Sequence, residues 1–120
     1  MARIAVIASE LMFASRISEI AAAAGHQVSL TTDFEPGSPA AAELLAAADL
    51  IVADLEAADP EALVGTGLPV LGIYSHVDIE TRRRAESAGV DRAVPRSKAV
   101  RELPELITEL GARPRSERSR

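Results

Sequence analysis

The chain contains no cysteine and no tryptophan, and its only aromatic side chains are Phe13, Phe34 and Tyr74. The absence of cysteine excludes disulfides, thiol nucleophiles and thiolate metal sites. Because aromatic residues are scarce while 48% of the chain is apolar, the core must be built from Ile, Leu, Val and Ala. That composition suits parallel strands alternating with helices. At 120 residues we expect a single domain.

Long apolar runs are also missing. The first run begins after Arg3 and ends at Ser9, which is too short for a secretory signal. No stretch approaches the roughly 18 apolar residues of a membrane-spanning helix. We therefore predict a cytoplasmic protein that does not contact a membrane.

The motifs of common catalytic and nucleotide-binding sites are absent. The turn at residues 8–11, Ala-Ser-Glu-Leu, has no glycine, so dinucleotide and Walker phosphate loops are missing. His26 and His76 lie far apart in the sequence, which argues against a dedicated metal site, and Gly-x-Ser-x-Gly does not occur. We predict no enzymatic activity and no bound cofactor.

The net charge of −5 is divided unevenly along the chain. Residues 1–111 hold nine basic and 17 acidic side chains, a balance of −8, whereas residues 112–120 hold four arginines and one glutamate, a balance of +3. An acidic body argues against direct binding of nucleic acid. We predict that residues 1–111 form the folded domain and that residues 112–120 form a disordered basic tail.

Apolar patterning predicts five units, each a strand followed by a helix. The predicted strands are 3–8, 27–31, 49–54, 68–74 and 91–94, and the helices begin after residue 10, Ser38, Asp59, Asp78 and Ser97. Pro104 interrupts the last helix, which predicts either a kink there or a helix that properly begins near Leu103.

Five such units predict an α/β fold with three layers, in which helices cover both faces of a parallel sheet. The flavodoxin-like strand order 2-1-3-4-5 fits best. This order places the first and third strands side by side, so residues 8–10 come next to Asp54. Ligands of open α/β sheets bind at the carboxyl ends of such strands, so Asp54 is the leading candidate site residue.

Several segments, in this order and spacing, resemble the receiver (CheY-like) domain of bacterial response regulators. They are Asp-Leu-Ile-Val-Ala-Asp-Leu at 49–55, Leu-Pro-Val-Leu-Gly-Ile-Tyr-Ser at 68–75, Ala-Gly-Val-Asp at 88–91 and a basic residue after the fifth strand. The resemblance covers roughly residues 3–110 and implies a role in signal transduction. By position it implies that Asp54 corresponds to the phosphoacceptor, Ser75 to the hydroxyl that senses the phosphoryl group, and Arg96 to the lysine that pairs with it.

The sequence departs from the family at the metal site. Ala8 and Ser9 stand where receivers have two adjacent acids that hold Mg²⁺, and Glu10 is the nearest acid, one position late. Transfer of a phosphoryl group to a carboxylate brings like charges together, and the metal offsets that repulsion. Without the acidic pair, Glu10 and Asp54 are weak metal candidates. The sequence therefore favours a pseudo-receiver that works without phosphorylation.

Most basic residues of the folded body are concentrated between positions 82 and 101. They are Arg82, Arg83, Arg84, Arg92, Arg96, Lys98 and Arg101. Apart from Arg96, these residues predict a basic docking surface on the fourth helix, fifth strand and fifth helix. Such a surface suits an acidic protein partner, or a second copy of the chain in a homodimer.

Three other interpretations stay open. A working stand-alone receiver would be phosphorylated at Asp54 through a relaxed Mg²⁺ site. A flavodoxin-like pocket would bind a small nucleotide or cofactor at the same crevice. Plain structural roles also fit, in which Asp54 caps the following loop or pairs with Arg96, Ser9 caps the first helix and Ser75 is a turn residue.

Overall fold

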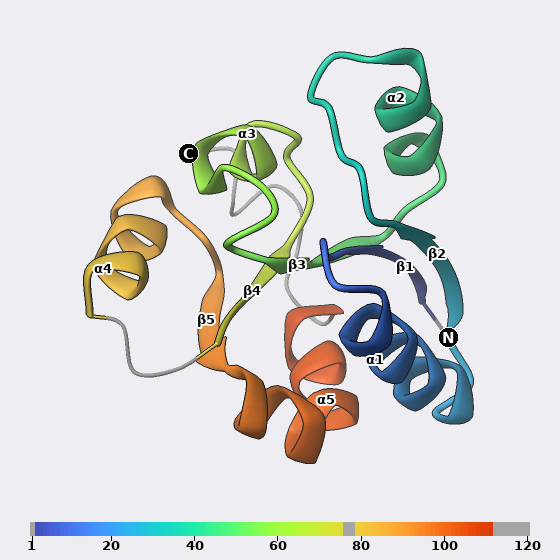
Figure 1. Ribbon diagram of the computed structural model, residues 1–120. Coiled ribbons are helices and arrows are strands. Elements are labelled where there is room, and N and C mark those ends of the chain that lie inside the picture. The colour runs from blue at the N-terminus through green and yellow to red at the C-terminus, as the bar shows by residue number, and fades with distance from the viewer. Residues whose placement is uncertain (1, 76–78, 112–120) are drawn as a thin grey trace.

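A five-stranded parallel sheet forms the centre of the protein (Figure 1). The structure is a computed structural model and describes residues 2–75 and 79–111. The strands are β1 (Arg3–Ile7), β2 (Gln27–Thr31), β3 (Leu50–Asp54), β4 (Val70–Tyr74) and β5 (Arg92–Pro95). Their order in the sheet is β2-β1-β3-β4-β5, which confirms the predicted order.

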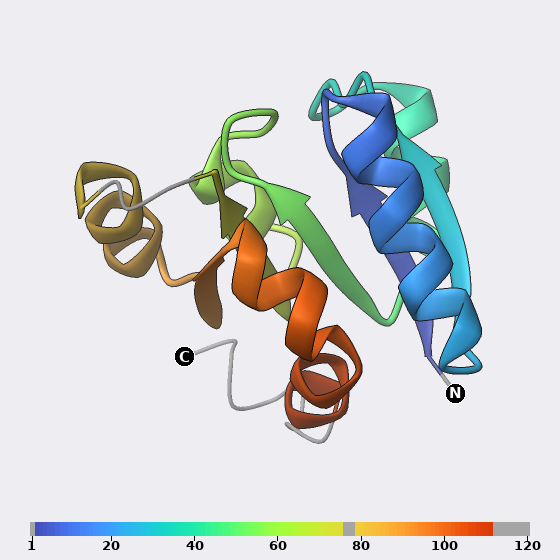
Figure 2. The same ribbon diagram turned by 60° about the horizontal axis from the view of Figure 1, so that its bottom comes forward.

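Helices cover both faces of the sheet, as the α/β prediction requires. They are α1 (Leu11–Ala23), α2 (Pro39–Ala46), α3 (Pro60–Val64), α4 (Ile79–Ala88) and α5 (Arg96–Gly111). Helices α1 and α5 lie side by side on one face, and α2, α3 and α4 lie on the other (Figures 1 and 2). The three-layer arrangement is confirmed.

The central strands are buried along their whole length because helices cover both of their sides. All five residues of β3 and all five of β4 are buried. Alternate residues point to opposite faces, so Leu50 and Val52 join the core under α1 and α5, whereas Ile51 and Ala53 join the core on the other face. This explains why the sequence shows continuous aliphatic runs here rather than an alternating pattern.

Two strands are preceded by a carboxylate that binds the neighbouring strand. The amide of Arg3, at the start of β1, donates to Asp49 Oδ2 at 2.8 Å, and Asp49 directly precedes β3. The amide of Val70, at the start of β4, donates to Asp91 Oδ2 at 2.8 Å, and Asp91 directly precedes β5. Each carboxylate therefore satisfies a backbone donor that the sheet leaves without a ladder partner.

The predicted helix starts are confirmed in part. Ser38 caps α2, since its Oγ accepts from the amide of Ala41 at 3.1 Å. Asp59 occupies the N-cap of α3 but makes no capping bond, and its carboxylate pairs with Arg84 at 3.0 Å. Asp78 lies outside the described residues, as do His76 and the tail 112–120.

The start of α5 differs from the prediction. The predicted cap Ser97 is wrong, because α5 begins at Arg96, directly after Pro95 ends β5. The predicted kink is confirmed: Glu102 has non-helical backbone angles (φ −124°, ψ 16°), two residues before Pro104. Proline lacks the amide hydrogen of a helical bond, and its ring disfavours helical angles just before it.

Candidate functional site

Asp54 is the last residue of β3 and lies at the carboxyl edge of the sheet, between β1 and β4. Its side chain is 1% exposed. Oδ1 accepts from the amide of Glu56 at 2.9 Å, and Oδ2 accepts from Nη2 of Arg96 at 3.2 Å. Asp54 therefore both caps the following loop and pairs with Arg96, which confirms the structural role left open by the sequence.

Arg96 reaches Asp54 from the first turn of α5. Its position follows from β5, which pairs with β4 so that Pro95 lies opposite Tyr74 and the next residue emerges at the same edge as Asp54. A second guanidinium nitrogen, Nη1, lies 3.4 Å from Oε2 of Glu10. The guanidinium carbon lies 4.3 Å from the centre of the Phe13 ring, within the range of a cation–π interaction.

Glu10 and Ser9 lie on the loop between β1 and α1. The interpretation of Ser9 as the cap of α1 is wrong, because Glu10 occupies the N-cap and makes no capping bond there. Its carboxylate is engaged by Arg96 instead. Ser9 is exposed.

Ser75 directly follows β4, the neighbour of β3 in the sheet. Its hydroxyl donates to Oε1 of Glu56 at 2.7 Å, so it is tied to the loop that Asp54 caps. Sequence reasoning did not single out Glu56 or Phe13 for this site. Their spacing in the sequence could have indicated both residues. Glu56 follows Asp54 by only two positions, and Phe13 lies one helical turn after Glu10, so each is close to a residue already assigned to the site.

The sequence matches no protein-family model, and no curated protein resembles it by sequence. Solved structures do match. A response regulator receiver domain protein from Clostridium thermocellum has a TM-score of 0.78 at 17% identity, over 92% of this chain and 94% of that one. A CheY-like receiver domain protein from Methanospirillum hungatei JF-1 has a TM-score of 0.72 at 19% identity, over 99% and 97%. The receiver domain of the Francisella response regulator 1452 has a TM-score of 0.73 at 17% identity, over 100% of both chains.

The chain has the receiver-domain fold. The similarity extends over nearly the whole sequence, so the resemblance seen in residues 3–110 is confirmed at the level of architecture. Within this receiver fold, Asp54, Ser75 and Arg96 lie on three strand ends at one edge of the sheet, as their positions in the sequence predicted.

The residues at the metal position of this receiver fold do not fit Mg²⁺. Positions 8 and 9 are Ala and Ser, so neither supplies a carboxylate. Both oxygens of Asp54 are engaged by donors, and the carboxylate of Glu10 shares the same guanidinium. Within residues 2–75 and 79–111, no three His, Asp or Glu side chains are grouped closely enough to hold a metal. Mg²⁺ prefers near-octahedral oxygen ligation, which this set does not provide.

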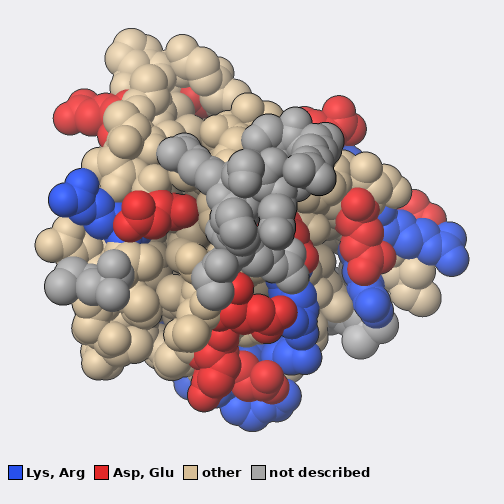
Figure 3. Space-filling model, turned by 180° about the vertical axis from the view of Figure 1, so that it is seen from behind, with Lys and Arg blue, Asp and Glu red and all other residues tan. Residues whose placement is uncertain are grey.

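Ion pairs within the domain cover much of the predicted basic surface. Arg82 pairs with Glu86 at 3.5 Å, Arg84 with Asp59 at 3.0 Å, Arg92 with Glu109 at 3.0 Å and Arg101 with Glu102 at 3.4 Å. Seen from behind, basic side chains lie directly beside acidic ones instead of forming one basic area (Figure 3). The surface is thus less positive than the sequence alone indicates.

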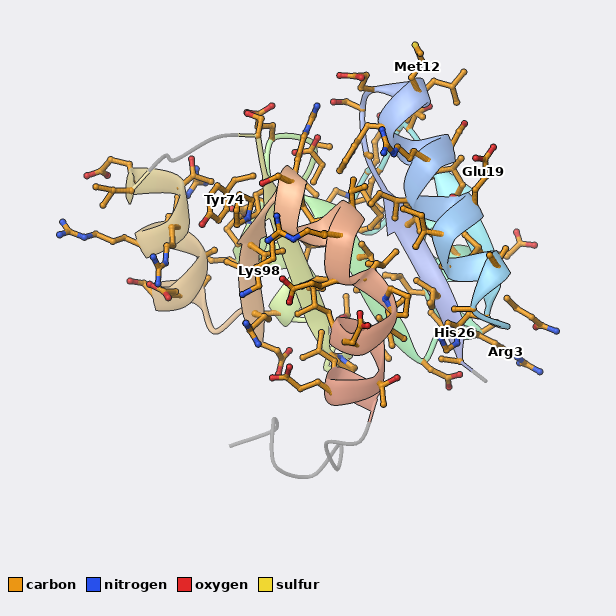
Figure 4. All side chains as sticks on the ribbon, turned by 90° about the horizontal axis from the view of Figure 1, so that it is seen from below. Arg3, Met12, Glu19, His26, Tyr74 and Lys98 are labelled. Atoms are coloured by element: carbon orange, nitrogen blue, oxygen red, sulfur yellow. The ribbon has the colours of Figure 1, made fainter. Side chains whose placement is uncertain are left out.

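Arg83 and Lys98 are the members of this surface that make no ion pair with the described part of the chain. Arg83 is exposed on α4, and Lys98 is partly exposed on α5. Figure 4 shows Lys98 on the side of α5 that faces α4. These two cations carry the positive charge that remains available to a partner.

A cavity of about 510 Å³ lies between β2 and α2, away from Asp54. It is lined by residues that include Leu30, Phe34 and Leu44, and none of its lining residues belongs to the Asp54 site. A nucleotide or cofactor pocket at the crevice stays a prediction.

Among the described helices none is long and apolar enough to cross a bilayer. The cytoplasmic location stays a prediction.

Proposed function

We propose that this protein is a signalling module of receiver fold that binds other proteins without being phosphorylated and is not an enzyme. The observation that carries the proposal is the 3.2 Å contact between Arg96 and the buried carboxylate of Asp54. In this arrangement the acidic side chain that matches the phosphoacceptor already has a cationic partner from its own chain.

The chemistry of phosphoryl transfer supports the proposal. The attacking oxygen must approach the phosphorus in line, and a divalent cation must offset the negative charge that accumulates. Both oxygens of Asp54 already accept hydrogen bonds, and the nearby acids are too few to recruit Mg²⁺. These contacts make phosphorylation of Asp54 unfavourable, which supports a role that does not depend on it.

The proposed docking surface consists of α4, β5 and α5. Arg83 and Lys98 supply its available positive charge, so the expected partner presents acidic side chains. A second copy of the chain is an alternative occupant, since the folded body is acidic overall. The arginines already paired within the domain contribute less, because each lies beside a carboxylate that offsets its positive charge.

The absence of phosphorylation is tested by incubating the full chain with acetyl phosphate and Mg²⁺ and measuring its intact mass. We expect no change in mass. An added phosphoryl mass that disappears in Asp54→Asn would instead establish a working receiver with a relaxed metal site, and would overturn the proposal.

The docking surface is tested by charge reversal. Arg83→Glu and Lys98→Glu should weaken binding to a partner recovered by pull-down, or weaken self-association measured by sedimentation. Arg16→Glu is the matched control, because Arg16 is exposed on α1, which is not part of the docking surface. Equal losses in all three variants, or no loss in any, would count against this surface.

A further inference from the structure

Two carboxylates at the carboxyl edge of the sheet share one guanidinium. Arg96 lies 3.2 Å from Oδ2 of Asp54 and 3.4 Å from Oε2 of Glu10. We infer that Arg96 is the resident cation of this site and excludes divalent metal ions from it. The inference rests on the proposed function, because it names the physical reason why the site would not be switched by metal and phosphoryl group.

Arg96 is held in place from several sides. Its backbone lies at the junction of β5 and α5, where the sheet register fixes it. Its guanidinium packs over the ring of Phe13, which is itself 9% exposed, and its two terminal nitrogens contact the two carboxylates. Planar stacking together with two donor contacts suits arginine better than lysine, whose ammonium is a compact point charge.

A cation that belongs to the chain has an advantage over a free ion. Its local concentration is set by the fold and does not depend on the solution. A divalent ion bound between Asp54 and Glu10 would lie next to a like charge, or would have to displace the guanidinium from the Phe13 ring and from both carboxylates. Either route makes metal binding unfavourable.

Removal of the guanidinium of Arg96 should allow a divalent cation to bind at Asp54 and Glu10. Without it, Asp54 and Glu10 present carboxylate oxygens at one edge of the sheet with no cation between them. Carboxylate oxygens are the ligands that hard divalent cations prefer. A weak metal site should therefore appear when Arg96 is replaced by an uncharged side chain of similar length.

The experiment compares Mn²⁺ binding by the full 120-residue chain and by Arg96→Met, in which the new side chain still covers Phe13. Binding is followed by paramagnetic broadening of the amide NMR signals of Leu55 and Glu56. Signals of Arg96→Met should broaden at Mn²⁺ concentrations about tenfold or more below those needed for the wild type. Adding Asp54→Asn to Arg96→Met should abolish this gain.

Arg92→Met is the matched control. It removes an arginine that pairs with a carboxylate, Glu109, at 3.0 Å but leaves the contacts of Asp54 in place. Its response to Mn²⁺ should equal that of the wild type. Circular dichroism checks that each variant is folded, and Arg96→Gln takes the place of Arg96→Met, with the same expected gain, if the methionine variant does not fold.

Two results would overturn the inference. One is broadening of Leu55 and Glu56 in the wild type at the same Mn²⁺ concentrations as in Arg96→Met, and the other is a folded Arg96→Met that gains no binding. Neither result needs a partner protein or a phosphodonor. Failure here is therefore distinguishable from failure of the proposed function, which is decided by intact mass and by charge reversal on α4 and α5.

Discussion

The guanidinium of Arg96 and the carboxylate of Asp54 form an ion pair at 3.2 Å, although 42 residues separate them in the sequence. The aspartate is almost fully buried, whereas the arginine side chain is 25% exposed. A buried carboxylate is costly unless it is paired and hydrogen-bonded, and here the pairing comes from the same chain. The stability of the domain and its proposed function thus both depend on this contact.

Asp54→Asn should destabilise the protein. The substitution removes the charge that Arg96 pairs with and keeps the volume of the side chain, so the free energy of unfolding should fall by about 1.5–3 kcal/mol. Urea unfolding measures the change, and Glu61→Gln on the exposed surface of α3 should stay within about 0.5 kcal/mol of the wild type. A gain in stability would mean that Asp54 is repelled by its neighbours rather than paired.

The stack of Arg96 on Phe13 should contribute measurable coupling. A double-mutant cycle of Phe13→Leu and Arg96→Gln removes the aromatic face and the cation separately and together. We expect a coupling of about 0.5–1 kcal/mol in urea unfolding, the range of a cation–π contact that is partly exposed. Strictly additive effects would show that the ring and the guanidinium, although 4.3 Å apart, contribute no coupling free energy.

Gly72 in β4 is required by the side chain of Leu55. A Cβ at position 72 would lie 2.9 Å from Cδ2 and 3.0 Å from Cγ of Leu55, so Gly72→Ala should lower the free energy of unfolding by about 1–3 kcal/mol through overpacking. The amide of Leu55 also donates to the carbonyl of Ile73 at 2.8 Å, which fixes its backbone, so relief must come from rotation of the half-buried Leu55 side chain. In a Leu55→Ala background the cost should largely disappear, and an equal cost in both backgrounds would exclude this clash as the cause.

Two helix starts of similar sequence should differ in their sensitivity to alanine. Ser38→Ala removes a capping bond to Ala41 and should cost about 1 kcal/mol. Asp59→Ala removes only the exposed ion pair with Arg84 and should cost less than about 0.5 kcal/mol. Both residues precede a proline at the first helical turn, so each is the control for the other.

The fold was predictable from the sequence because its signals are local and repeated. Aliphatic blocks such as 49–54 are bounded by residues that favour turns and helix starts, and five such units leave few topologies for a parallel sheet. The resemblance to receivers then aligned Asp54, Ser75 and Arg96 with one edge of the sheet. The structure confirms this arrangement.

The details of the site were less predictable, because they depend on contacts between distant residues. Ser9 has a strong local preference for a helix cap, but the chain places Glu10 there and directs its carboxylate to Arg96, 86 residues away. The basic surface shows the same limit. Composition reveals Arg84 and Arg92 but not their partners Asp59 and Glu109, which lie 25 and 17 residues away.

The carboxylates of Asp49 and Asp91 each bind the first amide of the strand next to their own. Both lie just outside the sheet, so the alignment of β3 with β1 and of β5 with β4 is anchored by residues that belong to no strand. A slip of either pair by one position would leave its carboxylate facing a carbonyl or empty solvent and would turn each buried side chain toward the wrong layer. These two acids therefore help to fix the register of strands that bury apolar residues on both of their faces.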